Sequence, residues 1–210
     1  MDIEQTKGQK PKAKHDTEKR VGEVIKAGSA EFIAQCYQLD EAPPLGCLVK
    51  TQGKPGHIYG VVYDVETQSL EPGRRVVARG EKLDSKDEVF AANPQLSRLL
   101  ATDFKVLVVG QVDGKKQRYY LPPTSAAIHS FVYICQTEEV RSFTESLDFL
   151  SLLLYSRIMV PVDEVVASCL RHASLTHPDV DAFLVKAGKE LARVLSNDIN
   201  RLNSLLKRLK

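Results

Sequence analysis

The stretch that decides the fold is Ala42-Pro43-Pro44-Leu45-Gly46-Cys47-Leu48-Val49-Lys50, followed after a short loop by Ile58-Tyr59-Gly60-Val61-Val62-Tyr63-Asp64-Val65. Neither proline can donate a hydrogen bond to a strand ladder, and both fix φ, so Pro43-Pro44 ends the element before it. Gly46 then permits the chain to turn back into a sheet. The stretch predicts a turn, a strand, a loop and a second strand, in which Gly60 marks a bend or a close approach of backbone.

Strand-like runs lie on both sides of this stretch, and turn-forming residues separate them. Further strands are expected over residues 21–26, 30–39, 74–79, 105–112, 117–121 and 131–135. Asp113-Gly114 is a hairpin-turn dipeptide between two of these runs. Residues 87–101 change to a helical period, which predicts one or two short helices broken near Asn93-Pro94. Six or seven short strands with turns between them favour a small β-barrel or a sandwich over residues 21–136.

Residues 138–210 carry a helical pattern. Apolar side chains from Phe143 to Leu154 fall on one face, Pro161 ends that helix, and a second helix follows. Pro178 fits the first position of a long last helix lined by leucines. That leucine stripe either packs on the preceding helices or forms part of an oligomer seam. Asp198 interrupts any regular heptad, which favours packing within the chain. The expected fold class is α+β, a small N-terminal barrel followed by a helical region.

Residues 1–20 form a third zone, with six basic and four acidic residues and almost nothing apolar after Ile3. Such a segment cannot bury enough surface to offset the entropy of ordering it. It is expected to be a disordered basic tail. Its charge suits contact with nucleic acid or anionic lipid, but a solvated tail without a target explains the same composition.

The composition is that of an ordinary globular protein. Of 210 residues, 43% are apolar and 27% are charged, and the net charge of +2 is too small to argue for nucleic acid or membranes by itself. No apolar run is long enough to span a bilayer, and the N-terminus has no signal-peptide pattern. The four cysteines form no Cys-x-x-Cys pair, so they are expected to be structural thiols of a reduced, cytoplasmic protein.

Three groups of residues in the β-rich zone resemble the HAS barrel, which the N-terminal region of HerA-type DNA translocases shares with rotary ATP synthase subunits. They are Val21-Gly22-Glu23-Val24, Ala42-Pro43-Pro44-Leu45-Gly46 and Tyr59-Gly60-Val61-Val62. In the HerA direction the likeness continues through Asn93-Pro94-Gln95-Leu96, residues 104–110, Leu121-Pro122-Pro123 and Phe131-Val132-Tyr133. It covers a little over half of the chain. The resemblance implies a barrel that makes ring-shaped contacts around a motor and presents a surface to partners.

The ATPase that follows the barrel in that family has no counterpart here. The nearest approach to its phosphate loop is Gly110-Gln-Val-Asp-Gly114-Lys115-Lys116. This run has one residue too few between its glycines, lacks the Ser or Thr that binds magnesium, and is expected in a hairpin rather than before a helix. Residues 138–210 are too short for a RecA-like core. ATP hydrolysis is therefore not carried over, and no cofactor is expected.

No catalytic or metal-binding pattern marks the remaining sequence. His172 and His177 are five apart, which is off the i, i+4 face that a helical metal pair needs. No Gly-x-Ser-x-Gly elbow is present. Glu138-Glu139 and Asp163-Glu164 stand at expected helix starts, where carboxylates favour the helix dipole. We expect no catalytic residue and no metal ligand, although members of a triad need not be close in sequence, and an unmarked hydrolase or nuclease stays a third hypothesis.

Two basic clusters are the candidate contact residues. Arg74 and Arg75, with Arg79 and Lys82 nearby, are expected near the barrel rim, and Lys115, Lys116 and Arg118 adjoin Tyr119-Tyr120 on a hairpin. Cations mixed with aromatic side chains are typical of single-strand binding by stacking and phosphate contact. A solvated hairpin whose tyrosines face the core explains the same residues.

The sequence therefore predicts a non-catalytic protein-interaction or assembly module. Its partner is expected to be another protein, such as a translocase-type ATPase, or a second copy of the chain. The alternative is a nucleic-acid-binding accessory factor that acts with a HerA-like translocase. A membrane is not expected among its partners.

Overall fold

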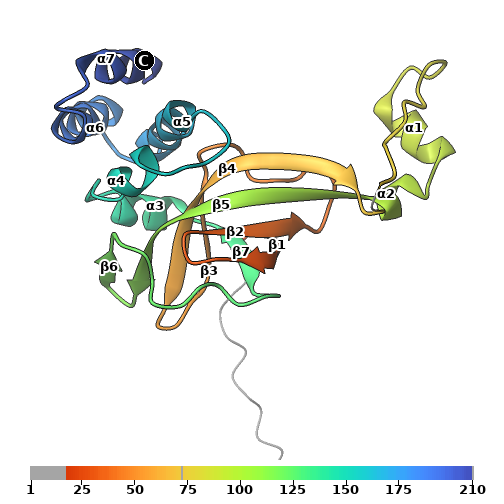
Figure 1. The fold of residues 1–210 in the computed structure, drawn as a ribbon, viewed down its shortest axis with the longest axis horizontal. Coiled ribbons are helices and arrows are strands. Elements are labelled where there is room, and N and C mark those ends of the chain that lie inside the picture. Colours follow the sequence, from red (N-terminus) through yellow and green to blue (C-terminus); the bar gives the residue numbers. More distant parts are fainter. Residues whose placement is uncertain (1–17, 72, 210) are drawn as a thin grey trace, which may run out of the picture.

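The computed structural model describes residues 18–71 and 73–209. Its strands are β1 (Arg20–Ala27), β2 (Glu31–Cys36), β3 (Leu48–Gln52), β4 (His57–Ser69), β5 (Leu100–Asp113), β6 (Lys116–Arg118) and β7 (Phe131–Ile134). Its helices are α1 (Lys86–Ala92), α2 (Leu96–Leu99), α3 (Thr137–Phe143), α4 (Leu150–Leu154), α5 (Val162–Ser174), α6 (Val180–Val194) and α7 (Ile199–Arg208). Figure 1 shows the last five helices gathered over one side of the strands. The predicted α+β class with a helical C-terminal region is confirmed.

The seven strands form one antiparallel sheet in the order β2-β1-β7-β3-β4-β5-β6. β2 also pairs with β5, so the six strands other than β6 form a circuit in which each strand has a ladder neighbour on both sides over part of its length. The predicted number of strands is confirmed. The predicted strand at residues 74–79 is wrong, because these residues lie in no strand. None of the seven strands of the described chain pairs with them.

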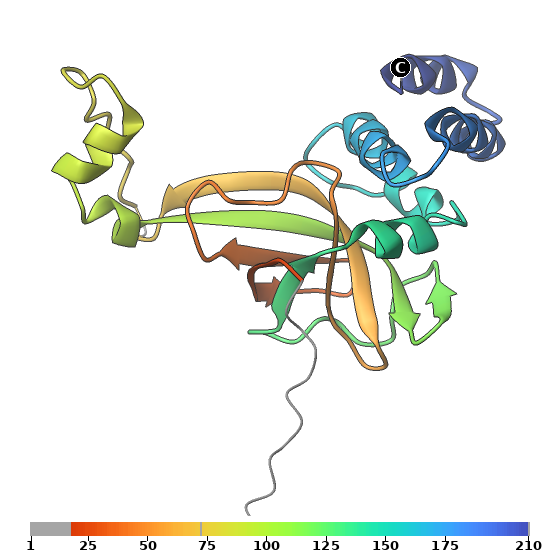
Figure 2. The same cartoon turned by 180° about the vertical axis from the view of Figure 1, so that it is seen from behind.

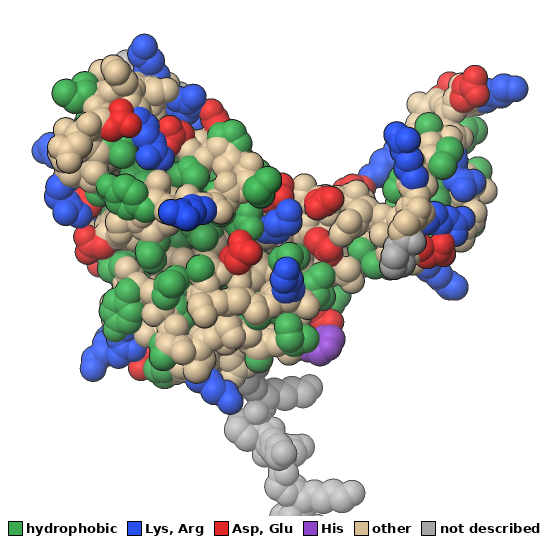
Figure 3. Space-filling view, in the orientation of Figure 1, with side chains coloured by type: hydrophobic (Ala, Val, Ile, Leu, Met, Phe, Trp, Pro, Cys, Tyr) green, Lys and Arg blue, Asp and Glu red, His purple; other side chains and the backbone are tan. Residues whose placement is uncertain are grey.

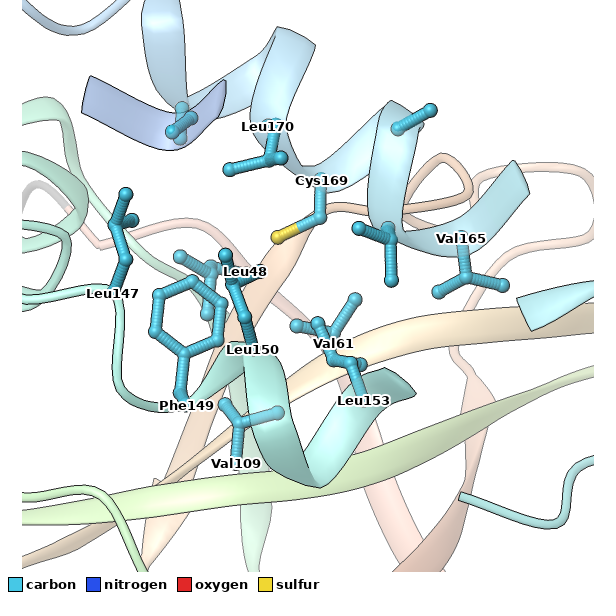
Figure 4. Packing of buried hydrophobic residues seen from close by; sticks show 14 of the residues in the cluster. Leu48, Val61, Val109, Leu147, Phe149, Leu150, Leu153, Val165, Cys169 and Leu170 are labelled. Atoms are coloured by element: carbon cyan, nitrogen blue, oxygen red, sulfur yellow. The ribbon is translucent and has the colours of Figure 1, made fainter. Parts of the chain in front are cut away.

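Both faces of strands β3, β4 and β5 are buried. Successive side chains point to opposite faces of a strand, and each face packs into a different core. One set of side chains packs inside the circuit of strands, and it includes Val49, Ile58, Val62, Phe104 and Val106. The alternate set faces the helices, and it includes Leu48, Tyr59, Val61, Leu107 and Val109. Figure 4 shows Leu48, Val61 and Val109 of the sheet against Phe149, Leu150 and Leu153. The helical region therefore shares a core with the sheet instead of closing on itself.

Two expected helices are divided in the structure. The run from Phe143 to Leu154 is not one helix: α3 ends at Phe143, residues 144–149 are not helical, and α4 begins at Leu150. The long last helix is split into α6 and α7 at Asp198, whose carboxylate accepts a hydrogen bond from the backbone N–H of Arg201 at 3.0 Å. Asp198 is thus an N-cap, which is a common use of Asp. The leucine stripe packs within the chain, since Leu191, Leu195, Leu205 and Leu209 belong to the same core as the sheet.

The Ala42–Gly46 stretch joins the sheet to helix α5. Gly46 has φ +80°, and its N–H donates to the carbonyl of Val62 at 2.8 Å. The hydroxyl of Ser168 in α5 donates to the carbonyl of Leu45 at 2.8 Å. A Cβ on Gly46 would lie 2.5 Å from the backbone nitrogen of Cys169. Glycine is needed here both for the left-handed backbone and for the close approach of α5.

Replacing Gly46 with Ala is expected to lower the free energy of unfolding by about 2 kcal/mol, because the left-handed conformation and the close contact each cost about 1–3 kcal/mol and α5 can shift to relieve part of the clash. Denaturant unfolding measures the effect. Gly114→Ala is a matched control: Gly114 also has a positive φ, of 59°, but no atom lies within 4 Å of the added Cβ. Equal losses for the two variants would show that the approach of α5 contributes nothing.

The last three residues of the expected tail contact the β-rich part of the chain. Residues 1–17 of the expected tail lie outside the described residues. Residues 18–20 already belong to the fold, since the carboxylate of Glu18 accepts from Lys50 at 2.8 Å and the carbonyl of Lys19 accepts from the N–H of Ile134 at 3.2 Å. The first strand begins at Arg20, and α3 begins at Thr137.

Candidate interaction surface

Strands β4 and β5 continue beyond the rest of the sheet as a two-stranded ribbon. Beyond the last β3 pair, at Val61, the ladder of β4 and β5 continues from the pair Asp64 and Lys105 to the pair Ser69 and Leu100. Because β2 pairs with β5 as far as Asp103, only residues 67–69 and 100–102 are two-stranded. Lys105 holds the base of the ribbon through ion pairs with Asp64 at 2.8 Å and with Glu66 at 3.8 Å. Figures 1 and 2 show the ribbon as an arm that carries α1 and α2 away from the helical region.

The end of the arm is a small lobe, which we define as residues 70–99. None of its described residues is buried, and its short helices α1 and α2 bury no side chain. Leu70, Val76 and Val77 are 52%, 54% and 66% exposed. Figure 3 shows a narrow waist between the lobe and the rest of the described chain, which we call the body. A segment of this size without a core gains little from the hydrophobic effect, so the burial of its own side chains does not account for the presence of the lobe.

Two polar contacts of Asp40 link the lobe and the ribbon to the body. Lys86 of α1 forms an ion pair with Asp40, which follows β2. The backbone N–H of Asp40 donates to the hydroxyl of Thr102 in β5 at 3.3 Å. A hollow of about 520 Å³ lies between the two parts, and Tyr37, Leu70 and Phe90 are among its lining residues. Both partners of the ion pair are at least half exposed, so this contact adds little stability.

The first predicted basic cluster lies on the lobe. Arg74 pairs with Glu71 at 2.6 Å, and Arg79 donates to the side-chain oxygen of Asn93 at 3.2 Å. Arg75 is exposed and makes no ion pair or hydrogen bond within the described chain. The cluster is therefore at the tip of an arm and not at the rim of the strand circuit, which corrects the expected location.

The second predicted cluster lies on the hairpin of β5 and β6. Lys115 and Lys116 are exposed, and Arg118 is half-buried. The ring of Tyr119 lies 5.1 Å from that of Phe143, and its hydroxyl donates to the carbonyl of Phe143 at 2.9 Å. Tyr119 faces the core, so it is not available to stack on a base.

The two basic clusters do not form one surface. They lie near opposite ends of β5, a strand of 14 residues. At a rise of about 3.3 Å per residue, such a strand is roughly 40 Å long. Figure 1 shows α2 at one end of β5 and β6 at the other. A ligand that contacts Arg75 and Lys115 together would have to follow the whole length of the strand.

A buried lysine is the main polar feature that the sequence reasoning missed. The side chain of Lys50 is 4% exposed and binds the carboxylates of Glu18, at 2.8 Å, and Glu139. Burial alone would lower the pKa of Lys50, but hydrogen bonds from the two carboxylates outweigh it and raise the pKa above its ordinary value. The ion pairs tie β3 to the N-terminal segment and to α3. The sequence signal that indicates a buried lysine is the position of Lys50 inside an expected strand, between Val49 and Thr51.

The cysteines are placed as structural thiols. Cys135 and Cys169 are buried, Cys36 and Cys47 are half-buried, and all four are free. Burial raises the pKa of Cys36 and Cys47 to about 11 and that of Cys169 to about 12. These thiols are protonated at neutral pH and are poor nucleophiles. Within residues 18–71 and 73–209, no group of three or more His, Cys, Asp or Glu side chains is arranged to hold a metal ion.

The chain matches no protein-family model, and no curated protein is similar enough to count as a match. Nor is any helix in the described part of the chain long and apolar enough to cross a membrane.

Replacing the lobe with a two-residue Asn-Gly turn between Ser69 and Leu100 is expected to change the free energy of unfolding by less than about 1 kcal/mol, since no buried contact is lost. Ser69 and Leu100 are ladder partners, so a hairpin turn can join them. Thermal unfolding of the full chain and of this variant measures the difference. A loss of several kcal/mol would mean that the lobe is part of the folding unit.

Proposed function

We propose that this chain is a non-catalytic protein-interaction or assembly module, in which the body holds the arm and the lobe meets another protein. The observation that carries the proposal is the lobe, whose described residues are all at least partly exposed at the end of a ribbon braced by Lys105. Exposed apolar side chains together on one projecting element are typical of an interaction site. An interaction role accounts for apolar side chains that are exposed in a lobe without buried residues.

The circuit of strand pairings supports the resemblance that the sequence suggests. We infer that β2, β1, β7, β3, β4 and β5 form a small barrel of the HAS type, with Phe32, Phe104 and Val106 among the side chains that fill its interior. Closure of a sheet removes its free edges. In the described chain, backbone then stays open to a partner at β6, at the ribbon part of β4 and in the lobe.

The experiment that tests the proposal compares the full chain with the variant whose lobe is replaced by Asn-Gly, in extracts of the natural host. Gel filtration with antibody detection should find the full chain in an assembly larger than its 23.4 kDa, and the variant as a monomer. The proposal fails if the full chain also elutes as a monomer, or if both proteins elute together in the same assembly.

The alternative function, nucleic-acid binding with a translocase, has weaker geometric support because only Tyr120 of the two tyrosines beside the hairpin is exposed and the basic clusters lie apart. We expect fluorescence anisotropy at near-physiological salt to detect no binding of single- or double-stranded oligonucleotides. Any binding at low salt should fall steeply as salt rises. Binding that persists at physiological salt and is lost in Lys115→Glu/Lys116→Glu/Arg118→Glu would favour the alternative.

A further inference from the structure

The lobe contains a run of backbone without hydrogen-bond partners. Residues 75–79 are all exposed, and none of their N–H or C=O groups bonds to another described backbone group. Val76 and Val77 in this run are β-branched, which favours a strand when a neighbour is available. Free backbone groups beside such residues are a template for an added strand.

An apolar hollow lies beside this run. Its volume is about 230 Å³, and half-buried Leu96, Leu99 and Leu100 line it. Arg74, Arg75 and Arg79 also border it. The hollow suits one apolar side chain of an extended segment, with charged groups of that segment meeting the arginines around it.

The charges around the hollow favour an acidic occupant. Glu71 already pairs with Arg74, but Arg75 has no partner in the described chain and Arg79 meets only the neutral amide of Asn93. The guanidinium groups of Arg75 and Arg79 therefore have no carboxylate partner in the described chain. A second copy of the chain could offer the ribbon part of its β4 as the added strand. The carboxylates of Asp64 and Glu66 on that edge already pair with Lys105, so they are poor partners for the two arginines.

We propose that residues 75–79 bind an extended, acidic segment of another protein by adding it as a β-strand. The strand would bond to the free backbone, place one apolar side chain over Leu96, Leu99 and Leu100, and bring carboxylates to Arg75 and Arg79. Such addition takes affinity from the main chain and specificity from side chains. The inference rests on the proposed interaction role and specifies the chemistry of the partner.

The test uses the full chain and a short fluorescein-labelled peptide of alternating Asp and Val residues, with a Lys-Val peptide as the charge-reversed control. The acidic peptide should bind and should slow amide hydrogen exchange at residues 75–79. Arg75→Glu/Arg79→Glu should weaken binding by at least about tenfold, since paired charges are lost and like charges are introduced. Lys115→Glu/Lys116→Glu makes the same change of net charge on the far hairpin and should leave the affinity unchanged.

Proline substitutions separate strand addition from simple charge attraction. Alternate residues of a strand direct their N–H groups to opposite edges, and proline removes the N–H. One of the two variants Val76→Pro and Val77→Pro should abolish binding of the acidic peptide, and the other should weaken binding much less. The controls Val76→Thr and Val77→Thr should both bind the peptide. Equal binding by the two proline variants would overturn the strand model.

Three other results would overturn the inference. They are absence of protection at residues 75–79 in saturating peptide, equal binding of the two peptides, and competition by a single-stranded oligonucleotide for the same two arginines. Dimerisation of the chain through residues 75–79 without peptide would also overturn it. If the peptide fails but the lobe-dependent assembly is still found in host extract, the inference is wrong and the proposed function stands.

Discussion

Phe143→Ala is expected to lower the free energy of unfolding by about 4 kcal/mol, because truncating a buried Phe loses its transfer free energy and leaves a cavity. Phe143 is fully buried at the end of α3. Its ring lies 4.9 Å from that of Tyr59, 5.1 Å from that of Tyr119 and 5.5 Å from that of Phe149. The cluster joins β4, the segment after β6 and the start of the helical region. A single side chain therefore supports contacts across the whole interface between sheet and helices.

Urea unfolding followed by far-UV circular dichroism measures this loss. Phe143→Leu keeps part of the volume and should lose about half as much stability or less. Tyr120→Ala removes an aromatic side chain that is 57% exposed and should stay within about 0.5 kcal/mol of the parent chain. If Phe143→Ala unfolds like Tyr120→Ala, the helices do not share a core with the sheet as described.

Lys50→Met is expected to lower the free energy of unfolding by about 3 kcal/mol, at the low end of the range for removing one partner of a buried ion pair. The low end applies because the side chains of Glu18 and Glu139 keep 22% and 25% of their exposure, so water can solvate them in part. Adding Glu139→Gln to Lys50→Met should restore part of the loss, and the double-mutant cycle gives the coupling. Full additivity would indicate that Lys50 and Glu139 do not interact.

The pH dependence of the same pair follows from the raised pKa of Lys50. A lysine whose pKa is higher in the folded chain contributes stability in full below its ordinary value of 10.5, and this contribution is lost as pH rises through the folded pKa. The difference between the parent chain and Lys50→Met should be constant from neutral pH up to about pH 10.5 and shrink above it. Buried thiols also destabilise the fold at alkaline pH in both proteins, and the charge of Lys50 lessens this effect only for Cys135 of the parent chain. A difference that grows above that pH would contradict the assignment.

The strands and the short helices could be read from the sequence because their signals are local. The alternation in residues 57–65, the Asp113-Gly114 turn and the break at Asn93-Pro94 each act within a few residues. The length of β4 and β5 could not be read in the same way. Residues 64–69 and 100–104 are stabilised by each other across the ribbon, and that pairing is not visible in either segment alone.

The candidate surface was found only in part. The sequence marked Arg74 and Arg75, but it placed a strand at residues 74–79, where Val76 and Val77 satisfy the local preference without a neighbour to pair with. It also grouped Tyr119 with the cations, whereas Phe143 and Phe149, distant in sequence, draw that ring into the core. The lobe was missed because lack of burial is a property of the assembled fold.

The most direct test of the interaction role is photocrosslinking from the lobe in the natural host. A photoreactive amino acid replaces Val77, which is 66% exposed, or, as a matched control, Val185 of α6, which is 58% exposed. The account predicts a specific protein adduct from position 77 and none from position 185. Adducts of equal yield from both positions, or none from position 77, would contradict it.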